Sequence, residues 1–149
     1  MKTNKLLMRF LTASTLLVLL FAAACGAGNA IQSPDGMALA EQGNIFMTYL
    51  KDINYDAVFD MLTPNTQQVL TRAMNMAAGI VDVESIIREN APILVKWKFG
   101  SAKIFIENGS KRGILDGVVE YPGGKRGTMH LEFEQQNGTW KVRGYTLEE

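Results

Sequence analysis

The sequence predicts an α+β protein: N-terminal helices packed on an antiparallel meander of about four strands. Three observations predict this class. Between Gly36 and about residue 90, apolar residues recur every three or four positions, as they do on one face of a helix. After Pro92 they alternate with polar residues, which is typical of half-buried strands. The alternating runs are separated by turn sequences, namely Asn108-Gly109, Pro122-Gly123-Gly124 and Asn137-Gly138.

The composition fits one folded domain and excludes several kinds of site. The 149 residues include 15 basic and 15 acidic side chains, one Cys and one His, and 47% of them are hydrophobic. A chain this apolar can bury a core. A single Cys excludes an intrachain disulfide, and one Cys with one His excludes a zinc finger. Because the formal net charge is zero, there is no long-range attraction to nucleic acid, and we expect no nucleic-acid partner.

The first 24 residues are typical of a secretory signal peptide. Lys2, Lys5 and Arg9 are the only charged residues before Asp35, and residues 10–24 are uncharged. This apolar stretch is shorter than the ~20 residues that cross a bilayer comfortably. A basic start, a short apolar stretch and small residues at its end define a signal peptide, with a membrane anchor or buried helix as the less favoured alternative.

The end of this segment, Ala22-Ala23-Ala24-Cys25-Gly26, resembles the lipobox of bacterial lipoproteins, although Ala22 stands where that family prefers Leu. The resemblance implies that the Cys25 sulfur takes a diacylglyceryl group and that Cys25 becomes the new N-terminus. Cleavage at an ordinary Ala-x-Ala site is the alternative. We expect a signal peptide over 1–24, a flexible tether over 25–35 and the folded domain over 36–149. Lipid would then anchor the protein to the cell membrane or outer membrane, with the domain outside the cytoplasm.

Removal of residues 1–24 changes the charge of the chain. It takes away three basic residues and leaves 12 basic against 15 acidic side chains, a net charge of −3. The mature chain is therefore expected to be mildly acidic.

Four helices are expected before the strands. The first has one apolar face, and Asn54 is suited to cap a short second helix. Thr63-Pro64 starts a third helix through Val69, Leu70 and Met74, which ends at Gly79. A further short helix is expected over 83–90. The apolar face of the first helix consists of Leu39, Gly43, Phe46, Met47 and Leu50.

The strands are expected at about 93–107, 112–121, 126–136 and 139–147. A type I′ turn centred on Asn137-Gly138 places Glu134 opposite Lys141 and Glu132 opposite Arg143. A three-residue turn at 122–124 extends the register. The sheet then has a charged face and an apolar face, which the helices can cover. On this register the apolar face carries Leu115, Val119, Tyr121, Met129, Leu131 and Phe133, and the charged face carries the opposed pairs Glu120–Arg126 and Asp116–His130.

The order of these elements and the final strand, Gly138-Thr139-Trp140-Lys141-Val142-Arg143-Gly144-Tyr145, resemble the nuclear transport factor 2-like superfamily. Within it, the chain is most similar to small bacterial lipoproteins of unassigned function. The resemblance covers roughly residues 36–149. It implies a cystatin-like α+β cone, in which a curved sheet wraps around helices and leaves a pocket at the wide end. This sequence has no evident strand between the early helices.

Four aromatic side chains are the candidates for lining such a pocket, and plain core packing is the alternative for each of them. Aromatic side chains supply large apolar area for either purpose. The candidates are Trp97, Tyr121, Trp140 and Tyr145, with Met74 and Met76 beside them.

The remaining charged candidates are expected to be structural. His130 falls on the charged face near Asp116, so we expect a surface histidine and not a general base. Asp52, Asp56 and Asp60 recur every four residues, but no Gly-containing loop with enough oxygen ligands for Ca²⁺ accompanies them. We expect a solvated helix face, no bound metal and no cofactor.

Two basic dipeptides, Lys111-Arg112 and Lys125-Arg126, do not predict a joint anionic-lipid patch. Successive turns of a meander lie at opposite ends of the sheet, so the two dipeptides should be a strand length apart. The turn sequence Gly123-Gly124-Lys125 precedes a strand and lacks the rest of a phosphate-binding loop.

The sequence thus predicts a non-catalytic, lipid-anchored envelope protein that binds a small apolar ligand or a protein partner. Its only other expected partner is the membrane that holds its N-terminal lipid. The alternatives are a cofactor-free cone-pocket enzyme that performs proton transfer or hydrolysis with Asp and Tyr, and an envelope assembly factor that uses the exposed sheet face.

Overall fold

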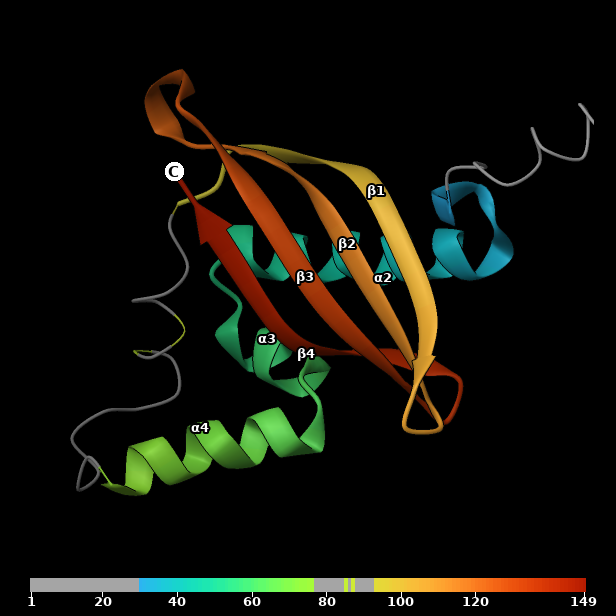
Figure 1. Ribbon diagram of the computed structural model, residues 1–149. Helices are drawn as coiled ribbons and strands as arrows, with labels where there is room; N and C mark the ends of the chain where they lie inside the picture. Colours follow the sequence, from blue (N-terminus) through green and yellow to red (C-terminus); the bar gives the residue numbers. More distant parts are fainter. Residues whose placement is uncertain (1–29, 77–84, 86, 88–92) are drawn as a thin grey trace, which may run out of the picture.

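Helices precede a four-stranded antiparallel sheet in the computed structural model, which describes residues 30–76, 85, 87 and 93–149 (Figure 1). The sheet is open, with its strands side by side in chain order. The α+β class is therefore confirmed. The elements are η2 (Ala30–Gln32), α2 (Pro34–Lys51), α3 (Tyr55–Met61), α4 (Pro64–Met76), β1 (Lys96–Glu107), β2 (Ser110–Glu120), β3 (Arg126–Gln136) and β4 (Thr139–Glu148).

Several expectations fall outside the described residues. These are the signal peptide, Cys25 and the first part of the tether. The helix expected over 83–90 also lies outside them, apart from Ser85 and Ile87. Among the described residues, no helix is long and apolar enough to cross a membrane.

Helix α2 lies across the apolar face of the sheet (Figure 1). It begins at Pro34, inside the segment expected to be tether, because Ser33 caps it. The Ser33 hydroxyl accepts a hydrogen bond from the Gly36 N–H at 3.0 Å, and Pro suits the first helical turn. The apolar face expected for this helix is confirmed, since every one of its residues is buried: Leu39, Gly43, Phe46, Met47 and Leu50.

The two shorter helices also start where the sequence predicts. The Asn54 side chain accepts a hydrogen bond from the Ala57 N–H at 3.3 Å, which caps α3. The Thr63 hydroxyl accepts one from the Thr66 N–H at 3.3 Å at the start of α4. Val69, expected on the buried side of α4, is instead 56% exposed. Adjacent residues on a helix point about 100° apart, and α4 turns its neighbour Leu70 toward the core.

The sheet register was largely predicted. Both Asn-Gly turns have positive φ at each central residue, as a type I′ turn requires. Glu134 pairs with Lys141 across β3 and β4, as expected. Across β2 and β3, the expected Glu120–Arg126 and Asp116–His130 pairs are both present. The apolar face carries all the predicted residues, none more than 2% exposed: Leu115, Val119, Tyr121, Met129, Leu131 and Phe133.

Two β-bulges interrupt the alternation. Gly100 is an extra residue on β1, opposite β2, and Arg143 is an extra residue on β4, opposite β3. The second bulge corrects one expectation, because Glu132 pairs with Gly144 and not with Arg143. An inserted residue shifts the register and bends the strand locally.

Part of the β4 edge is covered by the junction between α3 and α4. Leu62 forms a parallel bridge with Val142. The Thr63 N–H donates to the Val142 carbonyl at 2.8 Å. This junction fixes the start of α4 against β4 and so positions the cavity between them.

Candidate ligand pocket between α4 and β4

The four aromatic candidates do not lie together. Trp97, at the start of β1, is half-buried, and its indole N–H donates to the Asn44 side-chain oxygen at 2.9 Å. Trp140 follows the β3–β4 turn, at the opposite end of the sheet, and is buried. Tyr121 is also buried, beside the β2–β3 turn. The side chains of the two methionines expected beside these candidates lie outside the described part of the structure.

Tyr145, the fourth candidate, lines a cavity of about 440 Å³ between β4 and the helices α3 and α4, which we call the α4–β4 pocket. Cavities of ~300–1,000 Å³ are the usual size for small-molecule sites. None of the described lining residues is charged. The polar side-chain groups of this described lining are three hydroxyls, from two Thr residues and one Tyr. The lining consists of Val58, Leu62, Thr66, Leu70, Ile87, Gly144, Tyr145, Thr146 and Leu147.

Tyr145 is held in place by the core. Its ring stacks edge-on against Phe46, with the ring centroids 5.3 Å apart and the planes at 63°. Burial raises the pKa of the Tyr145 phenol to about 12, and the neighbouring Tyr55 adds a smaller effect in the same direction. The phenol therefore stays neutral at physiological pH, so it can donate and accept hydrogen bonds but is not suited to act as a general base.

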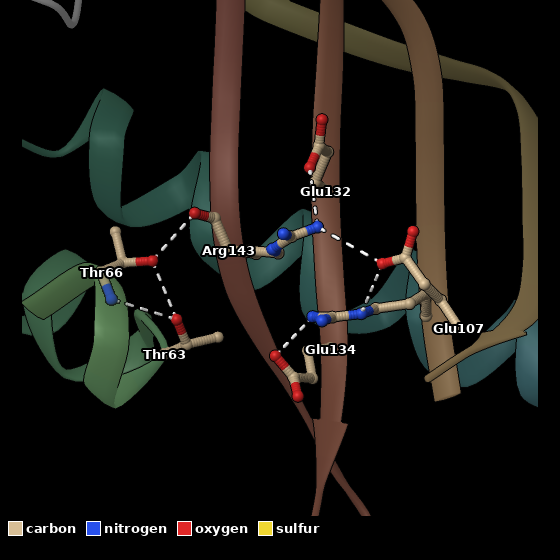
Figure 2. A network of polar contacts seen from close by, with 7 residues as sticks. Thr63, Thr66, Glu107, Glu132, Glu134 and Arg143 are labelled. Atoms are coloured by element: carbon tan, nitrogen blue, oxygen red, sulfur yellow. Dashed lines mark hydrogen bonds and ion pairs between the residues drawn. The ribbon is translucent and has the colours of Figure 1, made fainter. Parts of the chain in front are cut away.

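The wall formed by α4 is attached to β4 through two threonines (Figure 2). The Thr66 hydroxyl donates to the Arg143 carbonyl at 2.9 Å. The Thr63 and Thr66 hydroxyl oxygens are 2.8 Å apart and share a hydrogen bond. Sequence reasoning missed this attachment because Thr66 and Arg143 are far apart in the chain. The Thr-Pro start of α4 was its only local signal.

Behind this attachment, on the outer face of the sheet, ion pairs connect all four strands (Figure 2). Arg143 Nη1 lies 3.8 Å from a carboxylate oxygen of Glu107 and 3.8 Å from one of Glu132. Arg112 Nε lies 3.4 Å from Glu107, and its Nη1 pairs with Glu134. The side chain of Arg112 is only 14% exposed, so these partners are needed to offset its desolvation. The expected charged face thus carries a network of opposite charges, in which two arginines are paired with three glutamates.

His130 belongs to the same outer face. Its Nδ1 lies 2.6 Å from Asp116 Oδ1, and its Nε2 lies 3.5 Å from Glu132 Oε1. The hydrogen bond to Asp116 raises the pKa of His130 most, desolvation opposes it, and the charges of both carboxylates add to the rise. Both ring nitrogens have acidic neighbours, which favours the imidazolium and fits a surface ion pair better than a general base.

The three aspartates that recur every four residues lie on the surface. Asp52, Asp56 and Asp60 are all exposed. Within the part of the chain that the structure describes, no cluster of three His, Cys, Asp or Glu side chains could hold a metal ion.

Comparison with known proteins gives no relative: no protein-family model, no curated protein sequence and no solved structure matches the chain. The fold class and the chemistry of the α4–β4 pocket therefore carry the functional inference.

Proposed function

We propose that this protein is a lipid-anchored protein of the bacterial cell envelope whose cone-like domain binds a small apolar ligand in the α4–β4 pocket without catalysing a reaction. The observation that carries the proposal is the cavity of about 440 Å³ with an uncharged lining. Burial of an apolar ligand in such a cavity is favourable because it removes apolar surface from water, and the hydroxyls of the lining can orient the ligand. The neutral Tyr145 phenol and the absence of a carboxylate among the described lining residues favour binding over proton transfer.

The anchor is supported by the basic start, the short apolar stretch and the lipobox-like junction at Cys25. Its test is metabolic labelling with radiolabelled palmitate in the native host. We expect the label to follow the wild-type chain into the membrane fraction and to be lost from Cys25→Ala. Label that persists in Cys25→Ala, or membrane retention of the variant equal to the wild type, would contradict the anchor.

The ligand is tested by native mass spectrometry of the full lipidated chain, purified from its host in detergent and stripped of detergent in the gas phase. Leu70→Trp adds bulk to a residue that lines the pocket. Val69→Trp adds the same bulk to the exposed neighbour on the same helix and is the matched control.

We expect a bound small molecule of one mass in the wild type and in Val69→Trp, and its loss in Leu70→Trp. A molecule retained equally by both variants would place the ligand elsewhere. A wild-type chain with no bound molecule would refute the proposal that the pocket binds a ligand. Circular dichroism of each variant verifies that it is folded.

A further inference from the structure

A second cavity lies at the end of the sheet where β1 begins and the β2–β3 hairpin turns. Its volume is about 490 Å³, and it shares no lining residue with the α4–β4 pocket. We call it the β1–β3 cleft. The lining residues that bear on its chemistry are Lys96, Trp97, Lys98, Val118, Glu120 and Arg126.

The strand register brings its charged residues together from distant parts of the sequence. Glu120 pairs with Lys96 of β1 on one side and with Arg126 of β3 on the other. Lys98 pairs with Val118 in the same ladder, two residues further along β1. Side chains two residues apart on a strand share a face, so these residues lie on one side of the sheet.

The residues that line the cleft carry a net positive charge, unlike the chain as a whole. Lys96 Nζ lies 3.0 Å from Glu120 Oε2, so the one acidic lining residue already has a partner. The side chains of Lys98 and Arg126 form no hydrogen bond or ion pair with any residue that the structure describes. Three cations against one anion give a local charge of +2, whereas the whole chain has a formal net charge of zero. The cleft therefore attracts anions locally, although the chain as a whole is neutral.

The cleft also offers apolar surface beside these cations. Val118 is 52% exposed, although it occupies the solvent-facing side of a central strand between charged positions. Trp97, also in the lining, alternates with Lys96 and Lys98, and its side chain lies on the α2 side of the sheet, where the indole N–H bonds to Asn44. A site with apolar surface and unpaired cations complements a ligand that has both an apolar and an anionic part.

We propose that the β1–β3 cleft binds an amphiphilic anion, with its phosphate or carboxylate group at Lys98 and Arg126 and its apolar part against Val118. The anionic group belongs either to a membrane lipid headgroup or to a soluble molecule, and the recognition chemistry is the same for both. The site is independent of the α4–β4 pocket, because the two cavities have separate linings.

The test uses the full lipidated chain in phosphatidylcholine nanodiscs. In one arm, soluble hexyl phosphate is titrated and tryptophan fluorescence is followed. In the other, brominated phosphatidylglycerol replaces part of the phosphatidylcholine and quenching of tryptophan fluorescence is measured. Trp97→Phe identifies the signal that arises at the cleft in each arm.

The informative variant is Lys98→Gln combined with Arg126→Gln, and the matched control is Lys103→Gln. Lys103 is an exposed lysine of the same strand that does not line the cleft. We expect the double variant to weaken hexyl phosphate binding about tenfold or more, or to abolish quenching by phosphatidylglycerol, with Lys103→Gln unchanged.

Binding of hexyl phosphate without lipid quenching would identify a soluble ligand. Quenching without hexyl phosphate binding would identify a lipid headgroup. An equal effect of Lys103→Gln and the double variant would overturn the proposal, because any surface cation would then suffice. No response in either arm would also overturn it.

Discussion

Gly117 is a position in the middle of the sheet where a single methyl group should disturb strand pairing strongly. It lies on β2 opposite the Gly100 bulge of β1. A Cβ atom at Gly117 would lie 2.3 Å from the Lys98 carbonyl oxygen and 3.0 Å from the Phe99 Cα, and both of these are backbone atoms. It would also lie 2.4 Å from the Cε of Met129, a flexible side chain. The backbone contacts cannot be relieved by a rotamer change, so Gly117→Ala must push β1 away from β2.

Overpacking of this kind costs typically ~1–3 kcal/mol, and clashes with backbone belong at the upper end. We therefore expect Gly117→Ala to lower the free energy of unfolding by about 3 kcal/mol. With a urea m-value of about 1.5 kcal/mol/M, the unfolding midpoint falls by about 2 M. The corresponding fall in Tm is on the order of 10 °C for a domain of this size.

The assay is urea unfolding followed by tryptophan fluorescence, since Trp97 and Trp140 report on opposite ends of the sheet. Gly144→Ala is the matched control. Gly144 also lies beside a bulge, but a Cβ there would have no atom within 4 Å. The free energy of unfolding of Gly144→Ala should therefore differ from that of the wild type by less than ~0.5 kcal/mol. Equal midpoints for the two variants would refute the steric reasoning. A changed m-value would show that the variant alters compactness and not only stability.

Three further predictions concern single contacts. The pKa of His130 is raised above 6.5 by Asp116, so its contribution to stability is full below about pH 6.5 and is lost as pH rises through the folded-state pKa. Urea midpoints should therefore decline over that window in the wild type and stay flatter in His130→Gln, and parallel profiles would contradict this. Thr66→Val removes the hydrogen bond to the Arg143 carbonyl and should cost about 1 kcal/mol in calorimetry, whereas an unchanged Tm would make that contact dispensable. Leu115→Ala empties a fully buried position and should cost ~2–5 kcal/mol in urea unfolding, while a loss below ~1 kcal/mol would mean that the site collapses around the gap.

Local signals account for the parts of the fold that could be predicted. The buried face of α2 was predictable because a helix repeats its face every 3.6 residues. The hairpins were predictable because Asn-Gly accepts the two positive φ angles that a type I′ turn requires. The α2 start at Pro34 was missed, although Ser33-Pro34 is itself a helix-start sequence.

The bulges could have been recognised from the sequence, because they break the strict alternation of apolar and polar residues. Buried apolar positions on β4 fall on even numbers up to Val142, but Tyr145 faces the core from an odd one. On β1, the core-facing positions likewise change from an odd number at Phe99 to an even number at Ala102. A spacing of three within a strand pattern indicates an inserted residue.

The pockets could not be predicted from local patterns. The α4–β4 pocket depends on the Thr66 contact with Arg143, and the β1–β3 cleft depends on pairing across three strands. The expectation that Lys111-Arg112 and Lys125-Arg126 lie apart is confirmed by the register. The pairing instead places Arg126 near Lys96, a combination that only the sheet creates.

The contact between Phe46 and Tyr145 has a consequence for how the chain acquires its structure during synthesis. The two rings belong to the first long helix and the last strand. At ~5–20 residues per second, a ribosome needs roughly 5–20 s to make the chain between them. For that time Phe46 lacks the ring that packs against it in the folded domain, although β1 and β2, which also pack on α2, are made earlier. The packing around Phe46 is therefore complete only after β4 has been synthesised.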